Sequence, residues 1–319
     1  MFGLNQEHWL KKYGSFTFGI PSHDTINRVF SAIDPKEFGQ CFSEWVKTLC
    51  QLSDKEVVAI DGKRICNSFD KAKGQAAIHM VSALATKSGL CLGQTATMEK
   101  SNEITAIPEL LSFLEITGSI VTIDAMGCQK AIATKIVTKD ADYLLAVKGN
   151  HHSLEEGISD TVRFEKASDT HTETDYGHGR IETRQCSIFH SLKHIANAHE
   201  WDGLKTIVRI DSQRVIKATG EETNQTRYYI SSANGSAKQF NKWVRNHWGI
   251  ENKLHWILDV TFREDYSRKR KGYAAQNFNT IAKIALSILV NDTSFNASKK
   301  RKRLRAAINP EYREALLNF

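Results

Sequence analysis

Residues 240–259 read F-N-K-W-V-R-N-H-W-G-I-E-N-K-L-H-W-I-L-D, and this amphipathic stretch with an acid on its apolar side decides the fold. At about 100° per residue, one side of a helix carries Phe240, Val244, His247, Glu251, Leu254 and Leu258. The opposite side carries Lys242, Arg245, Asn246, Asn252 and Lys253. A buried carboxylate is unfavourable unless a cation meets it, and the apolar side contains no Lys or Arg. The partner of Glu251 is therefore expected to be His247, one turn earlier, or a metal ion.

Two further acids each follow a predicted apolar strand. Asp61 comes after residues 57–60, and Asp124 comes after residues 119–123. If these strands are neighbours, the two carboxylates lie side by side, which is unfavourable unless they share a divalent cation. Glu251, on a helix packed against the same sheet, would complete an all-oxygen site that selects Mg²⁺ or Mn²⁺ over zinc. Two such ions can activate a water or a 3′-hydroxyl and stabilise the leaving oxygen of a phosphodiester.

Other interpretations of these acids remain open from the sequence. Asp61 before Gly62 is typical of a turn, and Asp124 before Ala-Met-Gly is typical of a helix cap. His247, Glu251 and His255 are spaced at i, i+4 and i+8, as in a zinc site on one helix. A single straight helix rarely surrounds a tetrahedral ion, so His247 is expected instead to orient Glu251 or to contact a phosphate.

The order of predicted elements indicates an α/β protein with a mixed sheet. Predicted strands at 57–60, 76–86 and 90–98 form a meander, and helices at about 107–114 and 129–137 alternate with strands at 119–123 and 143–148. Residues 151–235 then read as a β-rich insertion around Gly177-His178-Gly179-Arg180, after a helix at 154–164. Near the N-terminus, Asp24 is expected to cap one helix, and a capping box at Asp34 to open another that ends near residue 49.

These elements predict three consecutive parts of the chain. They are an N-terminal helical segment (1–52), a catalytic domain (53–295, with the insertion at about 151–235) and a basic C-terminal tail (296–319).

Composition and charge favour a nucleic-acid partner. The 319 residues include 41% hydrophobic and 25% charged residues, as in ordinary soluble globular proteins, and the net charge is +7. Two basic runs, at 268–271 and 299–303, suit a phosphate backbone, although either run alone could be a solvated, partly disordered segment. The six cysteines form no CxxC pair, and no apolar run is long enough to span a bilayer. A cytoplasmic protein with reduced thiols, without structural zinc and without a membrane partner, is expected.

Several long strings resemble one family of bacterial insertion-sequence proteins. They are A-I-D-G-K, K-S-N-E-I-T-A-I-P-E-L-L, T-I-D-A-M-G-C-Q-K, A-V-K-G-N, G-H-G-R, R-Y-Y-I-S-S and R-N-H-W-G-I-E-N-K-L-H-W-I-L-D-V. The resemblance, which runs from about Trp9 to the end of the chain, is to the H-repeat-associated transposases of the DDE class. It implies an RNase H-like fold and a metal-binding triad of Asp61, Asp124 and Glu251. It also implies Mg²⁺ or Mn²⁺ as a two-ion cofactor, and assembly as a homo-oligomer on double-stranded DNA, both element ends and target.

The chain departs from many related DDE enzymes around Glu251. Where they have a Tyr and an Arg before the Glu and a basic residue after it, this chain has Val244, His247 and Leu258. Phosphate contacts are therefore expected from other basic residues, namely Lys148, Arg180, Lys253, Arg268, Lys269, Arg270 and Lys271. Family members also begin some tens of residues earlier. This leaves an alternative to an active transposase: a truncated, catalytically inactive DNA-binding remnant.

Overall fold

The computed structural model describes residues 2–69, 74, 76–97, 103–177 and 179–317. Met98, Lys100-Ser101-Asn102 and His178, which belong to a predicted strand and to two of the motifs above, lie outside the described residues. The chain forms two compact units. The helical unit comprises Met1–Phe42, Arg64–Ile78 and Ile257–Phe319, and the sheet unit comprises Ser43–Lys63 and His79–Trp256. Because the units interleave along the chain, they do not follow the three consecutive parts expected above, and that division stays a prediction.

The sheet unit is built on a nine-stranded mixed sheet in the order β3-β2-β1-β4-β5-β9-β8-β7-β6. Its strands are β1 (Val57–Arg64), β2 (His79–Ala85), β3 (Leu90–Thr97), β4 (Ile120–Ile123), β5 (Asp142–Val147), β6 (Asp169–Gly177), β7 (Arg180–Phe189), β8 (Thr206–Ile216) and β9 (Glu222–Ser231). β1, β4 and β5 are parallel, whereas β2 pairs with β3, and β5 with β9, in antiparallel fashion. This confirms the predicted mixed sheet and its RNase H-like character.

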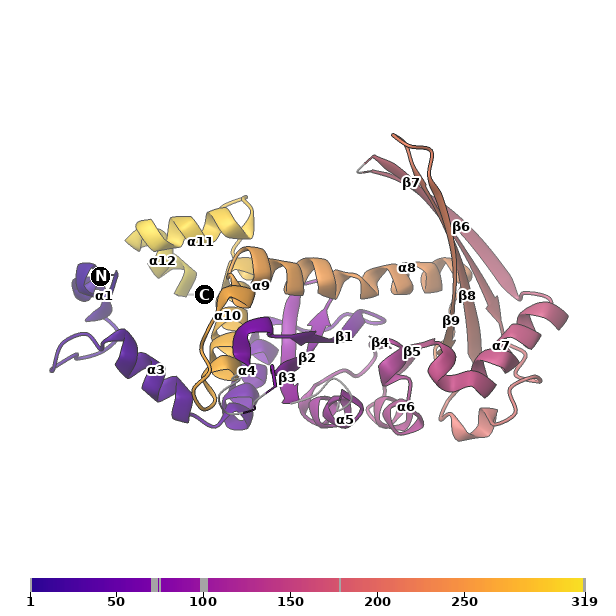
Figure 1. The fold of residues 1–319 in the computed structure, drawn as a ribbon, viewed down its shortest axis with the longest axis horizontal. Helices are drawn as coiled ribbons and strands as arrows, with labels where there is room; N and C mark the ends of the chain where they lie inside the picture. The colour runs from indigo at the N-terminus through magenta and orange to yellow at the C-terminus, as the bar shows by residue number, and fades with distance from the viewer. Residues whose placement is uncertain (1, 70–73, 75, 98–102, 178, 318–319) are drawn as a thin grey trace. The chain divides into compact units, whose positions relative to one another are not determined.

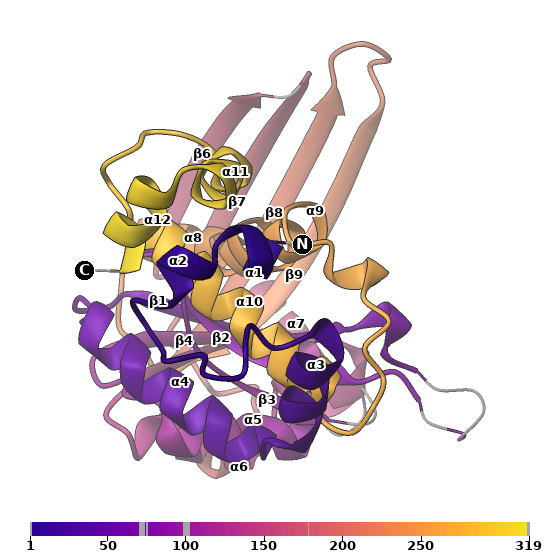
Figure 2. The ribbon, with the colours of Figure 1, turned by 90° about the vertical axis from the view of Figure 1, so that its left-hand side faces the viewer.

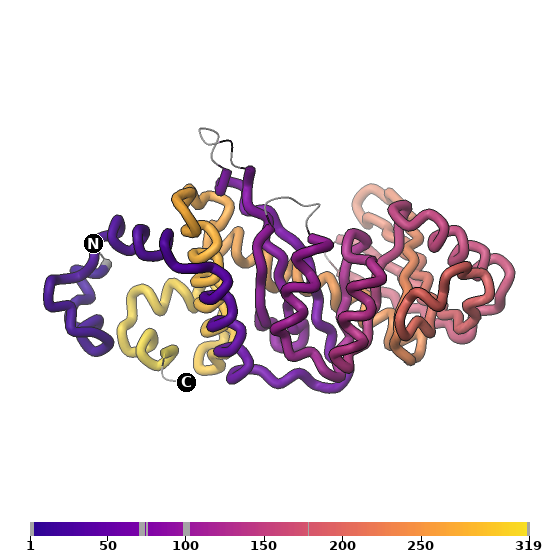
Figure 3. The backbone as a smooth tube through the Cα atoms, turned by 90° about the horizontal axis from the view of Figure 1, so that it is seen from below, coloured from indigo at the N-terminus to yellow at the C-terminus, as the bar shows by residue number. Residues whose placement is uncertain are grey.

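Helices cover both faces of the sheet (Figure 1). α5 (Glu103–Phe113) and α6 (Lys130–Val137) lie side by side on one face, as Figure 3 also shows, and α8 (Ala237–His247) lies on the other. α8 begins at a capping box in which Ser236 Oγ accepts from the Gln239 N–H. The apolar side of α8, including Phe240 and Val244, packs on the central strands and buries the face that the sequence pattern predicted.

The predicted β-rich insertion continues the central sheet. After α7 (His152–Phe164), strands β6 to β9 run antiparallel, and β9 joins the edge of β5. Figure 2 shows the four as long strands that extend in one direction. The inner ends of these strands are buried, with Ile188, Val208 and Ile230 each at most 2% exposed. The outer ends are largely exposed and polar, as the alternating Thr- and Arg-rich sequence indicates.

The helical unit contains the N-terminal and C-terminal helices. They are α1 (Phe2–Asn5), α2 (Glu7–Leu10), α3 (His23–Ala32), α4 (Pro35–Leu49, which continues into the sheet unit), α9 (Trp256–Val260), α10 (Ala274–Asn291), α11 (Lys299–Ile308) and α12 (Pro310–Leu317). Asp34 caps α4 as predicted, since its Oδ1 accepts from the Lys36 and Glu37 N–H groups. The prediction for α3 was wrong by two residues: Ser22, not Asp24, is the cap.

The basic C-terminal tail is folded. The side chain of Lys302 in α11 is only 5% exposed, and its ammonium contacts the Asp292 carboxylate at 3.1 Å. The same ammonium donates to the carbonyls of Leu289 and Asp292. A run of basic residues that could have been solvated throughout therefore contains a buried ion pair. Among the described residues, no helix combines the length and apolar character needed to cross a membrane.

Candidate functional site

The register of two parallel strands places Asp61 beside Asp124. Val57–Ile60 pair in register with Ile120–Ile123, so Ile60 lies opposite Ile123. The residue after Ile60 is Asp61, and the residue after Ile123 is Asp124. Neighbouring strands are about 4.8 Å apart, which puts the two carboxylates on adjacent positions at one edge of the sheet. This is the arrangement that the two apolar runs predicted.

Asp61 lies in a strand and not in the turn that is typical of an Asp-Gly pair. β1 continues to Arg64, so Asp61 and Gly62 are strand residues. A side chain at position 62 would collide with Glu103 and His79, which form a buried pair there. Gly62 is therefore required for close packing, and it allows a buried acid–imidazole pair to lie directly beside Asp61.

Asp124 caps a short helix and still faces the site. Its Oδ1 accepts from the N–H groups of Met126, at 3.0 Å, and Gly127, at 3.4 Å, at the start of a 3₁₀ turn, Ala125–Gly127. Because these two bonds use a single oxygen, the cap and a role for the other carboxylate oxygen are compatible.

Glu251 lies at a change of helix type. After α8 ends at His247, residues Glu251–His255 form a π-helical turn, and α9 follows from Trp256. The expectation that Glu251 is buried on the apolar stripe was wrong: Glu251 is exposed, whereas Leu254 and Leu258 are buried. The cause is that this side of the helix borders a cavity, which Glu251 lines together with Val244 and His247, so that the carboxylate is open to solvent.

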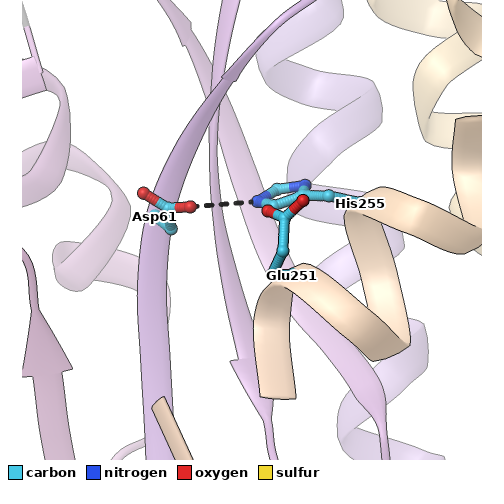
Figure 4. A group of neighbouring side chains, drawn as sticks. All are labelled: Asp61, Glu251 and His255. Carbon is cyan, nitrogen blue, oxygen red and sulfur yellow. Dashed lines mark ion pairs between the residues drawn. The ribbon is translucent and has the colours of Figure 1, made fainter. Parts of the chain in front are cut away.

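His255 is the residue that completes the cluster, and it was not among the predicted site residues. Ligand atoms of Asp61, Glu251 and His255 lie within 4.8 Å of one another (Figure 4). His255 Nε2 is 3.4 Å from Asp61 Oδ2, and the His255 side chain is 4% exposed. The spacing of four residues from Glu251 was the available signal, but in the sequence it was considered only together with His247 as a zinc site.

His247 occupies a different position from the one that a zinc site on a single helix requires. Its Nδ1 shares a hydrogen bond of 2.9 Å with the hydroxyl of Thr122, the strand residue two before Asp124. Burial lowers the pKa of His247, although the charges of Asp61 and Asp124 act in the opposite direction. A neutral imidazole fixed at Nδ1 is thus expected at neutral pH.

The predicted triad lines one cavity of ≈ 300 Å³. Its lining includes Asp61, Asp124, Lys148, His247 and Glu251. Arg227 and Trp248, which were not predicted, also line it, with the guanidinium 5.3 Å from the ring centroid. The structure therefore brings the three acids, His247 and Lys148 together, and the metal-binding role of the acids stays a prediction.

The two aspartates differ in proton affinity. Burial raises the pKa of Asp124, and the charges of Asp61 and Glu103 raise it further. Burial also opposes the charge of Asp61, but the close contact with His255 and the nearby His247 hold the pKa of Asp61 below its usual value. The excess negative charge of the site is therefore felt mainly at Asp124, where a cation would relieve it.

The other predicted phosphate-binding residues are dispersed. Lys253 donates to the Thr86 carbonyl at 2.6 Å, and Arg180 lies at the turn end of the β6–β7 hairpin. Arg268, Lys269, Arg270 and Lys271 belong to the helical unit, where they line a second cavity with residues of α3. In that run, Arg270 donates to the Asn67 carbonyl and Lys269 lies over the Phe278 ring.

Comparison with known proteins gives one consistent result. Residues 52–288 match the family described as "Transposase DDE domain", and residues 1–46 match a domain associated with it. The "Putative transposase YncI" of Escherichia coli O157:H7 is 46% identical over 322 residues, covering 99% of this chain and 83% of the relative. The "H repeat-associated putative transposase YhhI" of Escherichia coli K12 is 44% identical over 325 residues, covering 99% and 85%. A piggyBac transposase synaptic complex with hairpin DNA aligns at a TM-score of 0.44 with 11% identity, covering 83% of this chain and 57% of that one.

Proposed function

Because the chain belongs to the family of transposases with a DDE domain, we propose that it cleaves and joins DNA at the ends of an insertion sequence. The observation that carries the proposal is the convergence of acids from two neighbouring parallel strands and a helix on one cavity. Asp61, Asp124 and Glu251 are proposed as the metal ligands. Double-stranded DNA, both element ends and target, is the proposed substrate.

The chemistry of the donor set fits Mg²⁺ or Mn²⁺. Carboxylate oxygens are the ligands that these ions prefer, and burial together with the charges of Asp61 and Glu103 raises the pKa of Asp124, so a divalent cation would stabilise its charged form. Two bound ions would supply an activated water or 3′-hydroxyl and charge stabilisation for the leaving oxygen. Asp61, Asp124 and Glu251 are expected to hold them.

Other residues of the cavity are proposed to position the DNA backbone. Lys148 is exposed at its edge, and Arg227 is half-buried in it, so both can meet phosphate oxygens. His247 is fixed through Nδ1 by Thr122, so its Nε2 can be held in one direction toward a phosphate or toward Glu251. Cytoplasmic location and assembly as a homo-oligomer on DNA complete the proposal.

The test is strand cleavage of DNA that carries the element ends, in buffer with Mg²⁺. Glu251→Gln should reduce the nicking rate at least about 100-fold, because the amide removes a charged ligand. Since Glu251 is exposed, the same change should alter the free energy of unfolding by no more than about 0.5 kcal/mol in EDTA. Glu156→Gln, an exposed acid of α7, is the matched control and should cleave like the parent.

Two outcomes would contradict the proposal. Undiminished cleavage by Glu251→Gln would remove Glu251 from the site. A parent protein that binds these DNA ends but never nicks them in Mg²⁺ or Mn²⁺ would instead support the inactive DNA-binding remnant.

A further inference from the structure

The buried Nε2 of His255 contacts the Asp61 carboxylate but makes no hydrogen bond within the described part of the chain. The residue is 3% exposed. Buried polar atoms are nearly always paired, so an unpaired one at a cluster of acids needs an explanation. Figure 4 shows the ring directed at the Asp61 carboxylate, with the Glu251 carboxylate close to the ring.

The distance between His255 and Asp61 fits two ligands of one ion better than a hydrogen bond. His255 Nε2 and Asp61 Oδ2 are 3.4 Å apart, whereas a charge-assisted N–H···O bond is about 2.7–2.9 Å long. Two ligands about 2.1 Å from a shared ion are roughly 3 Å apart when adjacent and roughly 4.2 Å apart when opposite. The observed separation falls within that interval, and the three ligand atoms of the cluster all lie within 4.8 Å of one another.

The π-helical turn contributes two of the three side chains in this cluster, Glu251 and His255. Glu251 and His255 are the first and last residues of the turn, and both approach Asp61 from the helix side. π-helical turns are rare and occur frequently at functional sites. Here the turn presents a carboxylate and an imidazole together to the acid on β1.

We propose that His255 is a metal ligand, so that one ion of the centre is held by a mixed set of Asp61, Glu251 and His255 Nε2. The inference shares one assumption with the proposed function, namely that the cavity is a metal centre. It does not require that the chain cleaves DNA. An imidazole ligand favours Mn²⁺ and Co²⁺ over Mg²⁺ relative to an all-oxygen set. The centre would then prefer Mn²⁺ to Mg²⁺.

The direct test is pulsed electron paramagnetic resonance of Mn²⁺ bound to the full chain without DNA. A coordinated imidazole gives a ¹⁴N coupling to the manganese, and a histidine with a merely structural role gives none. The coupling should be present in the parent, should disappear in His255→Ala and should persist in His247→Ala. His152→Ala, an exposed histidine of α7, is the remote control and should also keep it.

Metal affinity, measured by calorimetry, gives an independent readout. His255→Ala should weaken Mn²⁺ binding at least about tenfold and Mg²⁺ binding clearly less. His255→Gln can place an amide oxygen near the position of Nε2, so it should recover most of the Mg²⁺ affinity without recovering the ¹⁴N coupling. This variant also keeps the test decisive if the alanine variant does not fold.

The results that would overturn the inference differ from those that would overturn the proposed function. Bound Mn²⁺ without ¹⁴N coupling in the parent would show that His255 is not a metal ligand. A coupling lost in His247→Ala and kept in His255→Ala would show the same. Either result would leave the proposed function standing. No binding of either ion to the parent would remove the metal centre and, with it, the proposed DNA chemistry.

Discussion

At the scale of single residues, Asp124 combines a structural contact with a position in the site. Its Oδ1 caps the 3₁₀ turn at Ala125–Gly127, while burial and the charge of Asp61 raise its pKa. A raised pKa means that the folded state holds the proton more tightly than the unfolded state. The charge of Asp124 therefore lowers stability at a pH above its folded pKa, and this loss vanishes as the pH falls below the unfolded value of about 3.9.

Substitution at Asp124 should separate these two effects. In EDTA at pH 8, Asp124→Asn should be at least as stable as the parent, because the amide oxygen keeps the cap and the charge is gone. Asp124→Ala should lose about 0.5–2 kcal/mol relative to Asp124→Asn, because the cap is gone. Urea unfolding at pH 8 and at pH 4 measures the free energy of unfolding of both variants and the parent. The difference in this free energy between Asp124→Asn and the parent should be smaller at pH 4. A marked loss of stability in Asp124→Asn at pH 8 would show instead that the charge of Asp124 stabilises the fold.

At the scale of elements, a buried ion pair links Lys302 of α11 to Asp292, the residue directly after α10. The Asp292 side chain is 4% exposed, and it accepts from the Tyr312 hydroxyl at 2.6 Å. Burial opposes the charge of Asp292, but bonds from Ser294, Tyr312 and Lys302 outweigh it and hold its pKa well below the usual range. Stability from a depressed carboxyl pKa is present above the unfolded value of about 3.9 and is lost as the pH falls through the folded value.

Lys302→Met should loosen α11 and α12 at neutral pH. It leaves the buried Asp292 without its cation, which costs on the order of 3 kcal/mol. Hydrogen exchange of α11 and α12 should accelerate, as should proteolysis between them. Lys300→Met, an exposed neighbour on α11, should behave like the parent. Equal protection in both variants would show that the ion pair does not hold these helices.

At the scale of the whole molecule, the acids and the basic runs belong to different units. Asp61, Asp124 and Glu251 are in the sheet unit, and residues 268–271 and 299–303 are in the helical unit. DNA affinity and metal chemistry should therefore be separable by mutation. Arg268 and Lys271 are exposed, whereas Lys302 of the second run is buried.

Arg268→Ala with Lys271→Ala should weaken DNA binding and make it less dependent on salt. Each lost phosphate contact should flatten the slope of log K against log salt by about 0.9 units on duplex DNA. The control is Lys193→Ala with Lys205→Ala, which removes the same charge from two exposed residues of the sheet unit. Its slope of log K against log salt should stay close to that of the parent. Fluorescence anisotropy from about 50 to 200 mM salt measures it. Equal slopes in both double variants would mean that only net charge matters.

Much of the fold could be predicted because its signals are local. The apolar runs before Asp61 and Asp124 predict buried strands, and the apolar positions Phe240 and Val244 predict the buried face of α8. Placing the two carboxylates side by side needed one further assumption, that these two strands are neighbours in the sheet.

The remainder depends on contacts that no local pattern contains. The exposure of Glu251 follows from the cavity that it lines together with Asp61 and Asp124, and a wheel of one helix does not contain that cavity. The cap of α3 was misplaced because Ser22 and Asp24 are both good cap residues. The burial of Lys302 follows from Asp292 and from backbone carbonyls that only the folded chain brings together.

The three acids lie far apart along the chain, so they are synthesised at different times. Glu251 leaves the ribosome long after Asp61, on the order of 10–40 s later at ordinary rates of synthesis. The β1 and β4 strands can pair during that interval, while the helix that brings the third acid does not yet exist. On the proposed function, a nascent chain therefore cannot cut nearby DNA before Glu251 has been synthesised. The sequence separation that slows folding would also delay the appearance of a nuclease.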